Sequence, residues 1–295
     1  VIAGLVFLLS VGVPRSLLAQ QDSSETAEAF SLLRQGKYRE ARESFRGQLN
    51  PSSVDRPVYV RGYAETFLGV GAYSRGLKEI SSLLEEYPQN PYLFYARGQL
   101  QEAVGEYSAA RGSYSRAMQQ AGNFWPNVLA LSELLEAVGE RSEARKLQIR
   151  IYRAYQRGEF RTAEMLSIAA RAGAALQQFH EANDAFRQAT KINSSHLQTL
   201  YWWAELFRQK YNKADAERTY KDVLAVNPRH AASYIGLAKT TGSFERKEEL
   251  ARRALEINEN SVGAHNILAE LRILDGQYAE ADSILQKALT VNPSA

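Results

Sequence analysis

The sequence contains no cysteine among its 295 residues. This absence excludes disulfide bonds, zinc sites with thiolate ligands and catalysis by a thiol. It does not exclude location in an oxidising compartment, because a large helical protein does not need disulfide bonds for its stability.

Signatures of catalysis and of phosphate binding are missing too. His180-Glu181 begins like a HExxH zinc motif, but Asp184 stands where the second histidine would be. No glycine-rich phosphate loop and no serine on a strand-to-helix elbow occurs. The four histidines have no metal-ligand spacing, and we expect them on helix surfaces: His180, His196, His230 and His265. We therefore predict that the chain is not an enzyme and has no catalytic, metal-binding or cofactor-binding residue.

The sequence also lacks a strong excess of one charge. The 36 basic and 33 acidic residues leave a net charge of +3, with the two signs interspersed. This distribution predicts no nucleic-acid partner. Apolar residues at 45% and charged residues at 23% are typical of a folded protein.

Long hydrophobic runs are absent except at the start. Residues Val1–Val13 are almost purely apolar, and Leu17-Leu18-Ala19 follows a break at Pro14 and Arg15. This pattern predicts a signal peptide over residues 1–19, cleaved after Ala19, and an exported protein, periplasmic or secreted. The alternative is an uncleaved anchor. The run is shorter than the ~20 residues that a membrane span needs, so we expect no stable span after cleavage.

The clearest pattern in the chain is the stretch Leu197–Pro228. Leu200, Trp203, Ala204 and Phe207 lie at i, i+3, i+4 and i+7, which predicts one apolar face of a helix. A second helix of the same kind follows, and Pro228 ends it, because proline lacks the N–H that a continuing helix needs. One such pair cannot bury both apolar faces, so it must stack on similar neighbours.

The neighbours recur with a period near 34 residues. Gly71, Gly105 and Gly139 are each 34 apart, and Tyr73 and Tyr107 keep the same offset. The pairs Ala182 and Ala216, Asn193 and Asn227, and Asn258 and Asn292 are also 34 apart. A helix–turn–helix pattern with this period is the signature of tetratricopeptide repeats.

The chain thus resembles the tetratricopeptide-repeat family, of the bacterial exported type, over nearly all its length after the signal. The resemblance implies an all-α fold: an α-α superhelix, a right-handed solenoid, of about eight helical hairpins. We expect repeats one to four in residues 20–156 and repeats five to eight in residues 157–295, as one continuous array with a truncated C-terminus. The spacing lengthens to 38 between Ala144 and Ala182 and shortens to 31 between Asn227 and Asn258. We expect the residues that lengthen the first spacing to lie near 155–162, and the residues missing from the second spacing to be lost near 241–246.

The resemblance also implies a binding surface, because the first helix of each repeat lines a concave groove in the family. Transferred by position, the predicted groove residues are Tyr95, Gln99, Glu102, Glu133, Arg171, Tyr201, Trp202, Glu205, Arg208, Lys239, Asn266 and Glu270. Trp203 matches a core position, whereas Tyr201 and Trp202 suit either core packing or ligand contact.

Two functions are compatible with these patterns. The first is a protein–protein interaction scaffold that binds a peptide or protein in the groove, in the bacterial envelope. The alternative is the N-terminal repeat region of a larger secreted enzyme, such as a gluzincin-type metallopeptidase, whose catalytic domain lies outside this chain. The partner's identity and the oligomeric state stay open.

Overall fold

The computed structural model describes residues 27–210 and 212–294, and these residues form helices and no strand. The predicted signal peptide lies outside them. The first hairpin pairs residues 27–34 with α2 (Tyr38–Gly47). Seven further hairpins follow: α4 (Pro57–Leu68) and α5 (Tyr73–Glu86), α6 (Pro91–Ala103) and α7 (Tyr107–Gln120), α8 (Trp125–Ala137) and α9 (Arg141–Gln156), α10 (Ala163–Ala175) and α11 (Phe179–Ile192), α12 (Leu197–Gln209) and α13 (Lys213–Val226), α14 (Ala231–Thr240) and α15 (Phe244–Ile257), and α16 (Val262–Leu274) and α17 (Tyr278–Val291). We call the first helix of each hairpin its A helix and the second its B helix.

The predicted eight hairpins and all-α fold are therefore confirmed. One element was not expected, the single-turn helix α3 (Pro51–Val54) between the first two hairpins. Asn50 and Ser53 form a capping box at its start, with each side chain bonded to the other residue's backbone N–H.

Small residues bring the two helices of a hairpin together. Ala110, Ala182 and Ala216 on the B helices are at most 1% exposed. On the A helices, a Cβ added to Gly98 would lie 2.5 Å from the ring of Tyr114 in the same hairpin, and one added to Gly236 would lie 2.3 Å from the ring of Tyr220 in the preceding hairpin. The glycines thus leave the space that these aromatic rings fill.

The two irregular spacings change helix lengths. Helix α9 has 16 residues, against 14 in α7 and α11, and residues 157–162 connect it to α10. Helix α14 has 10 residues, against 13 in α12 and α16, so the seventh repeat loses its three residues from its A helix.

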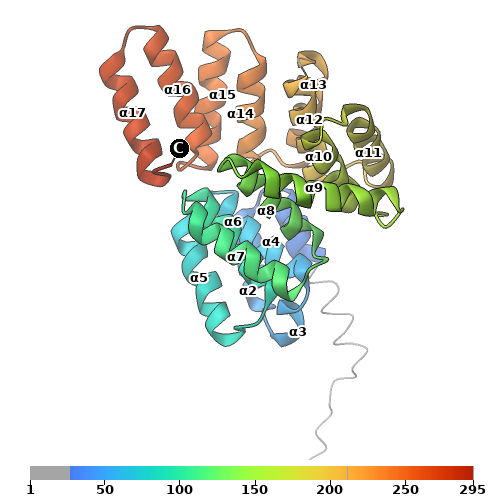
Figure 1. The fold of residues 1–295 in the computed structure, drawn as a ribbon. Helices are drawn as coiled ribbons and strands as arrows, with labels where there is room; N and C mark the ends of the chain where they lie inside the picture. The colour runs from blue at the N-terminus through green and yellow to red at the C-terminus, as the bar shows by residue number, and fades with distance from the viewer. Residues whose placement is uncertain (1–26, 211, 295) are drawn as a thin grey trace, which may run out of the picture.

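The stacked hairpins coil until the end of the array meets its beginning (Figure 1). The last three hairpins, α12 to α17, lie against the first three through a row of polar contacts that we call the seam. On one side are the turns between the A and B helices of repeats one to three. On the other are the loops after the B helices of repeats six to eight.

The seam consists of three similar sets of contacts. The side-chain amides of Asn227, Asn258 and Asn292 donate to the hydroxyls of Tyr38, Tyr73 and Tyr107, over 3.1, 3.0 and 3.3 Å. These asparagines are 2%, 7% and 8% exposed. Because both sides repeat with nearly the same period, a contact made in one repeat recurs in the next.

The turn at Gly71 shows why this side of the seam needs glycine. Its φ is +71°, and an added Cβ would lie 2.0 Å from Oδ1 of Asn258. Its carbonyl also accepts a hydrogen bond from the Asn260 side chain over 3.0 Å. Gly71 therefore both reverses the chain and lets the other side of the seam approach its backbone.

Candidate functional site: the inner face of the coil

The A helices face one another on the inside of the coil. The guanidinium of Arg61 on α4 forms an ion pair with Glu164 on α10, although two complete repeats lie between these helices in the sequence. Both side chains are about one-quarter exposed, at 26% and 27%. The predicted groove is therefore bridged at this level by its own side chains.

Arg171 on α10 joins two other A helices. Its guanidinium donates to both carboxylate oxygens of Glu133 on α8, over 3.1 and 2.6 Å. It also lies 3.8 Å from the centroid of the Trp202 ring on α12. This paired geometry gives stronger hydrogen bonds than a single contact, and the stacked ring adds a cation–π attraction.

Tyr201, Trp202 and Trp203 are all half-buried and have separate roles. Trp203 stacks against Phe207, with ring centroids 5.3 Å apart, and donates from Nε1 to Asn183 over 2.8 Å. Tyr201 packs edge-on against Trp202 and against the buried His230, each at 5.1 Å. Trp203 thus joins the packing between hairpins, as predicted, and the other two lie on the inner face.

Glu205 on α12 completes this part of the site. It accepts hydrogen bonds from Arg208 over 2.7 and 3.1 Å and another from the Tyr220 hydroxyl. Only 12% of the Glu205 side chain is exposed. Its carboxylate is therefore occupied by the protein's own donors.

Two half-buried carboxylates on the inner face hold their protons more tightly than free ones. Burial raises the pKa of Glu102 to about 6, although the Tyr114 hydroxyl donates to its carboxylate over 2.8 Å and lowers it in part. Burial also raises the pKa of Glu133, against the opposing effect of Arg171. Removal from water disfavours the charged form, and the nearby donors offset only part of that cost.

The remaining predicted residues have more varied positions. Tyr95 is 5% exposed and packs edge-on against Phe124 at 5.2 Å, so it belongs to the core of its repeat. Gln99 is half-buried, whereas Lys239, Asn266 and Glu270 are exposed. Glu270 lies 3.8 Å from Lys247. The open part of the predicted groove is therefore its C-terminal part, on α14 and α16.

Sequence reasoning missed Arg61, Glu65 and Glu164. The first two could have been found, because Arg61 and Glu65 precede Tyr95 and Gln99 by 34 residues and occupy the same repeat positions. Burial raises the pKa of Glu65, and the nearby Arg61 lowers it in part. Glu164 follows the irregular spacing after α9, so counting by the period does not reach it.

The histidine prediction was wrong for two of four positions. His180 is exposed, as expected, and His196 is half-buried. His230 and His265 are each 8% exposed. Burial lowers the pKa of His230 to about 4, so this ring is neutral near pH 7. Its Nδ1 lies 2.8 Å from the Ser233 hydroxyl, which places the ring at the start of α14.

The inner face shows hydrogen-bonding and ion-pairing groups. Across residues 27–210 and 212–294, no group of three or more His, Asp or Glu side chains could hold a metal ion. Within the same ranges no helix has the length and apolar character needed to cross a bilayer. What the arrangement offers is a polar surface for contact with another molecule.

A solenoid of eight helical hairpins with a polar inner face defines the class of protein. The family model for the tetratricopeptide repeat matches residues 262–294, which form the last hairpin. The last hairpin therefore matches the tetratricopeptide-repeat family by its sequence. No curated protein matches the sequence of the chain.

Two solved structures show the same fold. A chain in the crystal structure of the APC/C hetero-tetramer Cut9–Hcn1 has a TM-score of 0.58 and 14% identity, over 95% of this chain and 55% of that one. A tetratricopeptide repeat protein from Parabacteroides merdae ATCC 43184 has a TM-score of 0.50 and 16% identity, over 80% of this chain and 93% of that one. This chain therefore spans about half the length of the first protein. At these identities, the similarity shows the fold.

Proposed function

We propose that the protein is a non-catalytic scaffold that binds an extended segment of a partner protein on the inner face of α12, α14 and α16. The observation that carries this proposal is the exposure of Lys239, Asn266 and Glu270 on two neighbouring A helices. Upstream, the corresponding side chains bond to one another, as Arg171 does with Glu133. Protein binding is the general role of this fold.

The chemistry of this surface suits a peptide in extended conformation. Lys239 and Glu270 offer opposite charges, and Asn266 offers both a donor and an acceptor for a peptide backbone. Ile273, 45% exposed near the end of α16, adds apolar contact area. Polar groups that fix orientation beside exposed apolar area are typical of peptide-binding surfaces.

Site-specific photo-crosslinking tests the proposal. A benzophenone amino acid is placed at Asn266, and in a matched variant at Asp282, an exposed residue of the B helix α17. We expect Asn266 to capture a discrete partner in cells, with yield reduced by Lys239→Ala and Glu270→Ala. Capture of the same protein from Asp282 with equal yield would contradict binding on the inner face.

We also propose that the chain acts outside the cytoplasm, in the periplasm or as a secreted protein. The support is the apolar run Val1–Val13 followed by the small residue Ala19. A fusion of residues 1–30 to alkaline phosphatase, which is active only after export, tests the location. N-terminal sequencing should place the new start at Gln20, and an inactive fusion would contradict export.

A further inference from the structure

Helix α9 carries a concentration of positive charge that the chain as a whole does not show. Six basic residues and one acidic residue fall within residues 141–157, so this segment has a net charge of +5 against +3 for all 295 residues. The remainder of the chain is therefore slightly acidic. Interspersed signs elsewhere hide this cluster in the overall composition.

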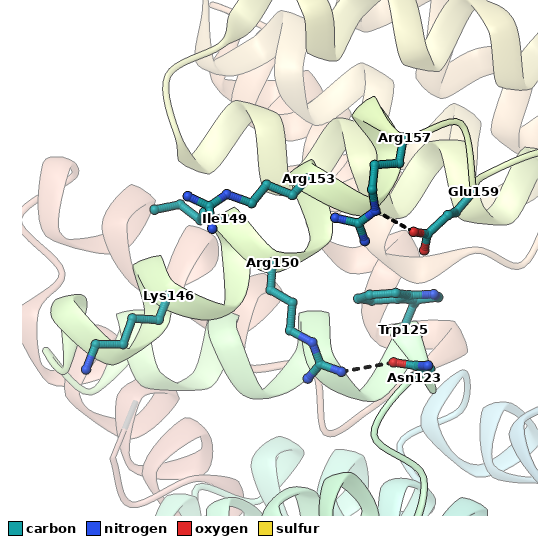
Figure 2. A pocket seen from close by; sticks show the side chains of 8 residues that line it. All are labelled: Asn123, Trp125, Lys146, Ile149, Arg150, Arg153, Arg157 and Glu159. Carbon is teal, nitrogen blue, oxygen red and sulfur yellow. Dashed lines mark hydrogen bonds and ion pairs between the residues drawn. The ribbon is translucent and has the colours of Figure 1, made fainter.

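Four of these cations line one pocket on the outer layer of the coil. Lys146, Arg150, Arg153 and Arg157 lie at i, i+4, i+7 and i+11, which places them along one stripe of the helix. Trp125 and Ile149 supply the apolar part of the same pocket. In Figure 2 the Trp125 side chain lies between those of Arg150 and Arg157.

The contacts of these cations leave part of the charge free. Arg150 donates to the Gly122 carbonyl over 2.7 Å and to Asn123 Oδ1 over 3.1 Å, and its guanidinium lies 5.3 Å from the Trp125 ring centroid. Neither oxygen neutralises it, because neither carries a full charge. Arg153 is exposed and forms no ion pair with any residue in the described part of the chain.

Acidic residues limit the cationic stripe at both ends. Glu143 pairs with Lys146 over 2.6 Å, and Glu159 pairs with Arg157 over 2.7 Å. These pairs are solvent-exposed, so each contributes little and can be exchanged for a partner's carboxylate. The uncompensated charge lies between them, at Arg150 and Arg153.

We propose that the α9 pocket is a second docking surface, distinct from the inner face, for a short acidic segment of a partner protein that carries one large apolar side chain. Charge complementarity favours carboxylates along the stripe, and Trp125 with Ile149 receives the apolar side chain. A nucleic acid fits less well, because the stripe covers one helix, carries one aromatic ring and belongs to a chain whose other residues carry a slight net negative charge.

Fluorescence anisotropy with the full chain tests this assignment. The probe is a labelled peptide of alternating Asp and Glu with a central Leu. One comparison peptide has Asn and Gln in place of the acids, and another has Ser in place of Leu. We expect binding of the acidic peptide to weaken as salt rises from about 50 to about 300 mM, because screening shortens the range of the attraction. Both comparison peptides should bind more weakly.

Charge reversal on the two faces of α9 provides the matched control. Lys146→Glu with Arg153→Glu changes the stripe, whereas Arg141→Glu with Arg145→Glu makes the same change in charge on the same helix outside the pocket. We expect the first pair to weaken binding by roughly tenfold or more and the second pair by much less. Equal losses for both pairs would overturn the proposal. Tighter binding of a single-stranded oligonucleotide of equal charge at the same residues would also overturn it.

Discussion

The seam makes Gly71 a position where one added methyl group should open the coil. In Gly71→Ala, the new Cβ would lie 2.0 Å from Asn258 Oδ1 while the backbone keeps a φ of +71°. The left-handed conformation costs about 1–2 kcal/mol for a residue with a side chain. If Asn258 moves away, its buried amide loses the bond to Tyr73 over 3.0 Å, which costs about 1–3 kcal/mol more. We expect a total loss of about 2–5 kcal/mol of unfolding free energy.

Gly139→Ala is the matched control. Gly139 ends its A helix in the same left-handed conformation, with a φ of +85°, but an added Cβ there would meet nothing within 4 Å. It should therefore lose only the backbone part, about 1–2 kcal/mol. Urea unfolding measures both losses, and small-angle X-ray scattering should show a larger radius of gyration for Gly71→Ala alone. Equal losses and equal scattering curves for the two variants would refute the reasoning.

Three further predictions concern packing and pH. Ala216→Glu should lower the unfolding free energy by about 3 kcal/mol or more, because it places a charge at a fully buried position. Ala225→Glu, on the exposed side of α13, should change the unfolding free energy little. Equal thermal melts for the two variants would contradict the assigned helix face. Glu102, with its pKa raised to about 6 from 4.5, stabilises the fold fully below pH 4.5 and loses that contribution as pH rises through 6. Glu102→Gln should therefore raise the unfolding free energy by at most about 2 kcal/mol at pH 8 and not at pH 4.5, as urea titrations at both pH values can check. His230, with its pKa lowered to about 4 from 6.5, contributes stability above pH 6.5 that is lost as pH falls to 4. His230→Asn, which keeps a residue suited to the start of α14, should remove about 3 kcal/mol of that fall, and an unchanged pH slope would contradict it.

The hairpins could be predicted from the sequence because their determinants are local. Gly98 and Tyr114 lie 16 residues apart and pack within one hairpin, so a 34-residue period records their contact directly. The positions of Ala216 and of the turn residues could likewise be predicted from the repeat period. Even the change in spacing before Asn258 predicted a shortened repeat, which the structure places in α14.

The seam could not be predicted in this way. Tyr73 and Asn258 are 185 residues apart, and they meet only because many small rotations between hairpins add up along the array. The sequence marked Asn258 only by its 34-residue spacing to Asn292 and gave no sign of its distant partner. The ion pair of Arg61 with Glu164 on the inner face could not be predicted for the same reason, because it depends on the curvature of the array from the second repeat to the fifth.

Dipolar coupling between two spin labels tests the closed coil most directly. The chain has no cysteine, so labels attach only to cysteines introduced at Lys37 and Arg229, both exposed and on opposite sides of the seam. A Cβ at Gly36 would lie 2.7 Å from the Cβ of Arg229, so we predict strong dipolar broadening of the double-labelled spectrum in solution. A spectrum equal to the sum of the two single-labelled spectra would show an open array and contradict the account.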